Sequence, residues 1–62
     1  MKNLNIRIEL NPDQAWAFAQ FLKRVGYSDY RPLAQNEEEA YEMQYAGELV
    51  RKAFAQSGIA PR

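Results

Sequence analysis

Cysteine and histidine are both absent from this chain of 62 residues. Without cysteine there is neither a disulfide nor a thiolate metal site. Without histidine the chain lacks the commonest metal ligand and the usual general base. Its three glycines are isolated from one another, which excludes a glycine-rich phosphate loop. We therefore expect a protein that is not an enzyme and that holds no metal and no cofactor.

Long hydrophobic runs and an excess of charge of one sign are also missing. No apolar stretch approaches the ~20 residues that a membrane-spanning helix needs. No signal-peptide core follows the first residues. Eight basic residues balance eight acidic ones, which argues against strong non-specific binding to polyanions. The expectation is a cytoplasmic protein without membrane contact, for which nucleic acid is a less favoured partner than protein.

The chain is short enough for its size to limit its stability. Residues 1–62 form a single domain, and a domain of this length buries only about 60% of the surface that its unfolded form exposes. Small domains are usually stabilised by disulfides, by a metal or by a second subunit. Because the first two are excluded, we expect a homodimer.

The N-terminal residues alternate strictly between apolar and polar side chains. A period of two is typical of a half-buried strand, and it predicts one over residues 3–10. Nothing else in the chain alternates well enough to pair with this strand. The pairing strand is then expected from a second copy, antiparallel across a two-fold axis, or from the sheet of another protein. The apolar set is Leu4, Ile6, Ile8 and Leu10, and the polar set is Asn5, Arg7 and Glu9.

A first helix is predicted over residues 12–25. Asn11 and Gln14 have the spacing of a capping box, and proline at the first helical position suits a helix start. Gly26 is expected to end the helix in a left-handed conformation. One broad apolar face is expected, made of Ala15, Phe18, Ala19, Phe21, Leu22 and Val25.

A second helix is predicted over residues 37–57, after a connection at residues 27–35 that is long enough to hold a short turn of its own. Asn36 is its expected cap, and three glutamates follow in the first turn, where the helix dipole favours them. Gly58 is expected to end it, with the next residue folding back. The predicted fold is therefore α+β and mostly helical, with the order β-α-α.

Gly47 lies in the middle of the second predicted helix, on its apolar face. A glycine there costs about 1 kcal/mol relative to alanine. Interior glycines usually mark close contacts, so we expect the other helix or the strand to approach at this point.

Three aromatic residues fall away from the apolar faces, and they are the partner-binding candidates: Trp16, Tyr41 and Tyr45. Tryptophan and tyrosine are enriched among the residues that dominate binding at protein interfaces. The alternative is that Trp16 packs on the long connection and that Tyr41 packs on the strand or on the second subunit. Both interpretations stay open at the level of sequence.

The order of strand, helix, glycine and helix resembles that of ribbon–helix–helix repressors, over residues 3–26. In those proteins two strands pair between chains and enter the major groove of DNA. The resemblance implies that Asn5, Arg7 and Glu9 would face the bases. It is opposed by the glutamates that open the second helix, because they would repel a phosphate.

The segments Trp-Ala-Phe-Ala-Gln-Phe-Leu-Lys-Arg, at residues 16–24, and Ala-Tyr-Glu-Met, at residues 40–43, are similar to a family of short uncharacterised bacterial proteins. That family is often associated with mobile elements, and the resemblance implies no established activity. The favoured hypothesis is a non-enzymatic protein–protein interaction or regulatory module, dimeric through its N-terminal strand. The alternative is a ribbon–helix–helix-like transcriptional regulator that binds DNA through Asn5 and Arg7.

Overall fold

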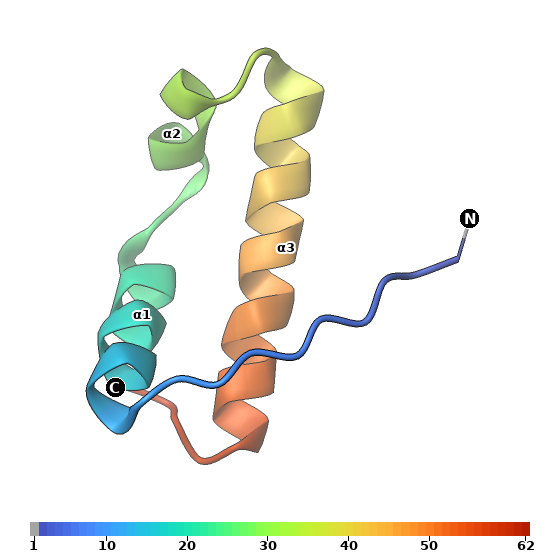
Figure 1. Ribbon diagram of the computed structural model, residues 1–62. Coiled ribbons are helices and arrows are strands. Elements are labelled where there is room, and N and C mark those ends of the chain that lie inside the picture. Colours follow the sequence, from blue (N-terminus) through green and yellow to red (C-terminus); the bar gives the residue numbers. More distant parts are fainter. Residues whose placement is uncertain (1) are drawn as a thin grey trace.

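The computed structural model describes residues 2–62, which form a helical hairpin preceded by an extended segment (Figure 1). Residues 2–10 are called the arm. The arm leaves the start of the first helix, passes in front of the C-terminal half of the long last helix in this view and extends beyond it (Figure 1). The elements in chain order are α1 (Pro12–Arg24), α2 (Tyr27–Tyr30), the short 3-10 helix η1 (Arg31–Leu33) and α3 (Glu37–Gln56).

The N-terminal strand predicted over residues 3–10 is not formed. No residue from 2 to 62 belongs to a strand, so the expected β-α-α fold is wrong and the fold is helical. The arm is extended but unpaired, and its apolar side chains lie in solvent. An alternating pattern gives a strand only where a second strand accepts the backbone hydrogen bonds and a surface covers the apolar face. A single copy of this chain supplies neither.

The start of α1 follows the prediction closely. The Asn11 side chain accepts a hydrogen bond from the Gln14 amide at 2.8 Å, and the Gln14 side chain accepts one from the Asn11 amide at 3.1 Å. This reciprocal capping box satisfies two amides that the helix itself leaves unpaired.

The end of α1 differs from the prediction. The helix stops at Arg24, and the next residue is already extended. Gly26 has a φ of −129°, so it is not the left-handed stop that the sequence suggested. Its amide instead donates to the Asp29 carboxylate at 2.8 Å, which starts α2. The connection at residues 27–35 therefore contains two short helical turns, as its length suggested.

The caps of α3 hold both of its ends. The Asn36 side chain accepts from the Glu39 amide at 2.8 Å, and the Glu39 carboxylate accepts from the Gln35 amide at 3.0 Å. At the other end Gly58 has a φ of +87°, and the Ile59 amide donates to the carbonyl of Phe54 at 2.8 Å. This is the glycine stop that the sequence predicted. The helix ends at Gln56, one residue earlier than expected.

The two long helices pack antiparallel around a thin core. The Phe18 ring of α1 meets the Phe54 ring of α3 edge to face, with ring centres 6.2 Å apart. A single leucine and three alanines are the buried apolar residues of the described chain: Ala15, Ala19, Leu22 and Ala40. Small side chains let the helices approach closely, but they bury little apolar surface. Among residues 2–62 there is no helix of the length and hydrophobicity needed to cross a bilayer.

Candidate protein interface

The surface of this chain is unusually large and apolar for its size. The chain exposes 5608 Å² to solvent. A folded monomer of 7.2 kDa is expected to expose about 4,100 Å², so the excess is about 1,500 Å². Two apolar surfaces and one group of tyrosines hold most of the large hydrophobic side chains that are exposed.

The first apolar surface is the arm. Leu4, Ile6 and Ile8 are 87%, 78% and 70% exposed, although they are among the most hydrophobic residues of the chain. The alternation places them on one side of the extended backbone and their polar neighbours on the other. Single exposed apolar residues are common in proteins, but a row of three on an extended segment is a candidate binding surface.

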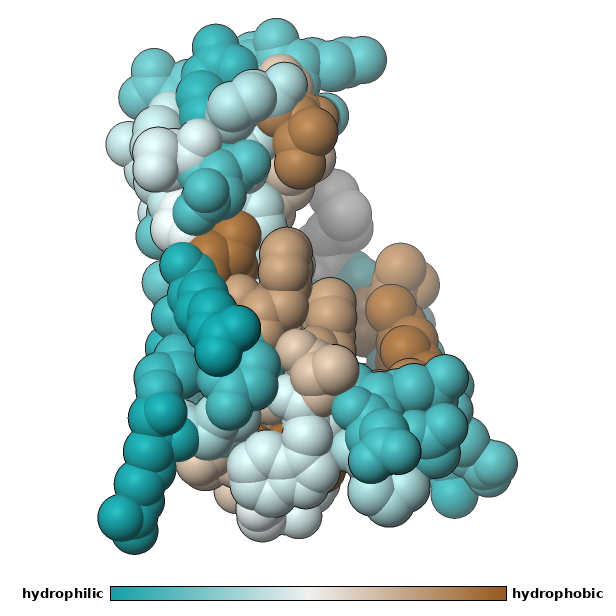
Figure 2. Space-filling view, turned by 90° about the vertical axis from the view of Figure 1, so that its left-hand side faces the viewer, coloured by the Kyte–Doolittle hydropathy of each residue, from teal (hydrophilic) through white to brown (hydrophobic). Residues whose placement is uncertain are grey.

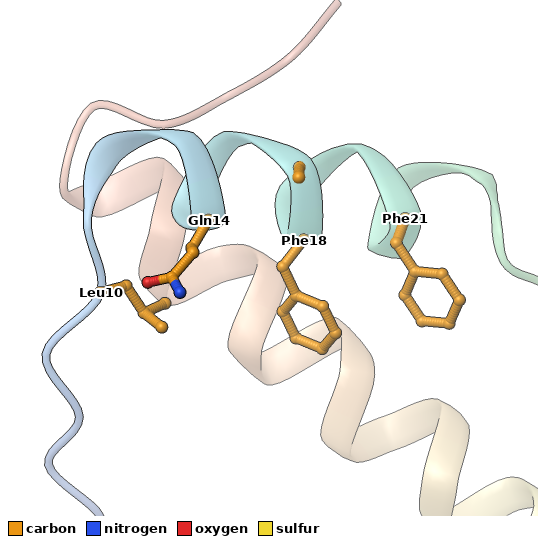
Figure 3. A pocket seen from close by; sticks show the side chains of 5 residues that line it. Leu10, Gln14, Phe18 and Phe21 are labelled. Atoms are coloured by element: carbon orange, nitrogen blue, oxygen red, sulfur yellow. The ribbon is translucent and has the colours of Figure 1, made fainter.

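The second apolar surface is a groove along α1, lined by Leu10, Gln14, Ala17, Phe18 and Phe21. The labelled side chains all point to the same side of α1 (Figure 3). Phe18 and Phe21 stack with ring centres 5.6 Å apart and planes inclined by 11°. They are 45% and 51% exposed, because α3 covers only the adjoining face of α1. We call this surface the α1 groove.

Apolar side chains gather in the middle of the α1 side of the molecule and are bordered there by polar ones (Figure 2). The sequence placed Phe18 and Phe21 on the apolar face of α1 but did not single them out as binding residues. The width of that face could have predicted an exposed apolar surface, because it holds six residues and is too broad for one neighbouring helix to cover. The tertiary packing decides which of these six residues stay exposed beside α3.

The third surface is a group of tyrosines where α2 meets the start of α3. The rings of Tyr27 and Tyr41 lie 4.8 Å apart, and those of Tyr41 and Tyr45 lie 6.3 Å apart. Tyr41 is 40% exposed and Tyr45 is 55% exposed. The structure therefore brings together two of the three predicted partner-binding residues. It adds Tyr27, which the sequence gave no reason to connect with them.

Trp16, the third predicted partner-binding residue, lies elsewhere. It is 44% exposed and is located near the start of α1. The nearby contact between Phe18 and Phe54 places this end of α1 against the C-terminal part of α3. Trp16 and the tyrosines are consequently at opposite ends of the hairpin and cannot form one patch. The alternative in which Tyr41 packs on a strand is wrong, because no strand is formed in the described chain and its ring packs on Tyr27.

The environment of Tyr27 favours its protonated form. Loss of surrounding water raises the pKa of the Tyr27 phenol above its ordinary value, and the nearby Glu37 and Tyr41 raise it further. The Arg31 guanidinium acts in the opposite direction. At physiological pH the neutral ring of Tyr27 packs against Tyr41 as an ordinary aromatic contact, with the two planes inclined by 35°.

Asn5 and Arg7, the candidates for reading DNA, lie exposed on the polar side of the arm. The two-stranded ribbon that would carry them into a major groove is not present in residues 2–62. The start of α3 carries three glutamates in its first turn. No group of three or more acidic residues in the described chain is arranged to hold a metal ion.

Comparison with known proteins gives one result. Residues 1–62 match a family of unknown function, DUF7706, and the chain belongs to that family. The resemblance to an uncharacterised family is thus confirmed, whereas the association with mobile elements stays a prediction. No curated protein and no solved structure matches the chain.

Proposed function

We propose that this member of a family of unknown function is a non-enzymatic protein–protein interaction module that works as a homodimer joined through its N-terminal arms. The cytoplasmic location expected from the sequence is part of this proposal. So is the expectation that Trp16, Tyr41 and Tyr45 contact a further protein partner. The proposal does not depend on a strand within the chain.

The observation that carries the proposal is the exposed apolar row of the arm. Burying a leucine or isoleucine side chain contributes about 1.5–3 kcal/mol. Leu4, Ile6 and Ile8 are exposed in a single copy, so burying them against a partner would stabilise the protein considerably. The thin core makes this stabilisation important, because few other contacts oppose unfolding. A second copy with the same arm is always available and offers a matching surface by symmetry.

The amount of uncovered surface also fits an obligate homodimer. Such interfaces bury about 2,000–5,000 Å² in total, or roughly 1,000–2,500 Å² on each chain. The excess accessible surface of about 1,500 Å² per chain falls within this range. A weak, transient contact would leave most of that excess in solvent.

Sedimentation equilibrium over a range of micromolar concentrations tests the proposal. The wild-type chain is expected to sediment as a dimer. Ile6→Glu should weaken the dimer by about 100-fold or more, because two charges would be placed in the apolar interface. Asn5→Glu adds the same charge to the neighbouring residue on the polar side of the arm, and it should leave the dimer intact. A wild-type chain that stays monomeric at every concentration would contradict the proposal.

A further inference from the structure

We propose that the α1 groove of one copy binds the arm of the other, so that the two chains of the dimer exchange their arms. This inference rests on the proposed homodimer and names the surface that each arm covers. The arm and the groove are the two uncovered apolar surfaces of the described chain that lie next to one another in sequence, meeting at Leu10.

The groove has the chemistry that the arm needs. Four of its five lining residues are apolar, and two of them are half-exposed phenylalanines. The exception is Gln14, whose side chain already accepts a hydrogen bond from Asn11 in the capping box. A charged or strongly polar ligand would find little to bind there, whereas leucine and isoleucine side chains would displace water from both surfaces.

The dimensions of the two surfaces agree. An extended chain advances about 3.3 Å per residue, so Leu4 and Ile8 are separated by about 13 Å, with Ile6 halfway between them. A helix advances 1.5 Å per residue, so Gln14 and Phe21 are separated by about 10 Å along α1. Leu10 lengthens the groove at its near end (Figure 3). Three apolar side chains in a row therefore span the length of the groove.

The arm of the same chain cannot easily fill this groove. Residues 6–10 would have to reverse direction immediately before α1, and this stretch contains none of the residues that favour tight turns. The capping box at Asn11 also fixes the direction in which the chain enters the helix. Intramolecular filling would therefore require breaking a local structure that the sequence stabilises. The arm of a second copy meets no such restriction.

Exchange of arms limits the assembly to a dimer, because it leaves no arm and no groove free to bind a third copy. If the arm of one chain covers the groove of its partner, a two-fold axis makes the partner's arm cover the first groove in return. Leu10 belongs to both surfaces, since it ends the arm and begins the groove. The two arms would thus cross near Leu10, and the arm and the α1 groove of both copies would be covered at once.

Disulfide trapping tests the exchange directly, because the natural chain has no cysteine. A chain with Ile6→Cys is mixed with a chain carrying Ala17→Cys and a C-terminal size tag, and the two are refolded together and oxidised. The expected product is a disulfide between the two chains of different size. Ser28→Cys replaces Ala17→Cys as the control, because Ser28 is exposed on α2 outside the groove, and it should give little of this product.

The outcomes separate the inference from the proposed function. A dimer by sedimentation whose Ile6→Cys chains cross-link only to one another would overturn the exchange and leave the homodimer standing. A disulfide that forms within single chains carrying both Ile6→Cys and Ala17→Cys, in place of one between chains, would show that the arm fills its own groove. A monomer by sedimentation would remove both proposals.

A second measurement does not depend on cross-linking. Phe21→Ser is expected to raise the dissociation constant of the dimer by about tenfold or more, because it removes half of the stacked aromatic pair from the groove. Leu49→Ser is the control, since Leu49 is a large apolar residue of α3 that is 68% exposed and lies outside the groove, and it should leave the constant unchanged. Equal effects of the two substitutions would contradict the assignment of the interface to the groove.

Discussion

The phenol oxygen of Tyr30 lies against Gly47 so closely that a Cβ atom at position 47 would overlap it. The ring carbon that bears this oxygen would be 3.4 Å from such a Cβ, and a methyl carbon of Leu22 would be 3.5 Å from it. Three elements therefore meet at this glycine, namely α1, α2 and α3. The predicted close approach at Gly47 is confirmed, and the neighbours are helices rather than a strand.

The contact between Tyr30 and Gly47 leads to a prediction on stability. Gly47→Ala should destabilise the wild-type chain by about 1 kcal/mol, because the displacement of Tyr30 outweighs the better helix propensity of alanine. In a Tyr30→Phe background the oxygen is gone, and the same substitution should stabilise the chain by up to about 1 kcal/mol. Denaturant unfolding of the four chains at one protein concentration gives the coupling energy. A coupling near zero would mean that the two residues do not constrain each other.

The cap of α3 gives a second prediction. Asn36→Ala removes the side-chain acceptor of the Glu39 amide and should cost about 1 kcal/mol. For a domain of this size the midpoint of thermal unfolding should fall by about 4–8 °C. Gln35→Ala is the control, because Gln35 contributes only its backbone amide to the contact with Glu39. If both substitutions lower the midpoint equally, the cap is not the cause.

The raised pKa of Tyr27 predicts a dependence of stability on alkaline pH. The folded chain holds the phenolic proton more tightly than the unfolded chain, so this contribution is fully present below the ordinary tyrosine pKa of about 10. It is lost as the pH rises through the higher pKa of the folded state. The wild type should therefore lose more stability than Tyr27→Phe between about pH 9 and pH 11. Denaturant unfolding at both pH values measures this difference, and an equal loss of stability in the two chains would contradict the raised pKa of Tyr27.

Binding to DNA is expected to be absent. In a ribbon–helix–helix repressor Asn5 and Arg7 would reach the bases from a ribbon paired between two copies, whereas exchanged arms would each lie in a groove. The three glutamates in the first turn of α3 would also repel a phosphate. A titration with random duplex DNA at low salt, near 50 mM, favours phosphate contacts and is the most sensitive test. We expect no saturable binding and no difference between the wild type and Arg7→Ala. Sub-micromolar binding that depends on sequence and that Arg7→Ala abolishes would instead support a DNA-binding regulator.

The sequence predicted the features that depend on near neighbours. The capping box at Asn11 and Gln14, the cap at Asn36 and the glycine stop at Gly58 all lie where the residue types placed them. Each is built from residues no more than a few positions apart, so the local sequence carries the whole cause. The tight packing at Gly47 was also predicted. Glycine destabilises a helix relative to alanine, so a glycine in mid-helix indicates that a neighbour leaves no room for a side chain.

Three features depended on tertiary structure. The arm has the alternation of a strand, but a strand also needs a partner for its backbone, and no sequence pattern can supply one. The contact of Tyr41 with Tyr27 arises because α2 folds back onto α3, which local propensity does not encode. The exposure of Phe18 and Phe21 arises because α3 covers only the adjoining face of α1. The sequence by itself thus determined where α1 and α3 begin and which glycine stops α3. The packing of the helices decided which apolar side chains remain exposed, because burial depends on residues distant in the chain.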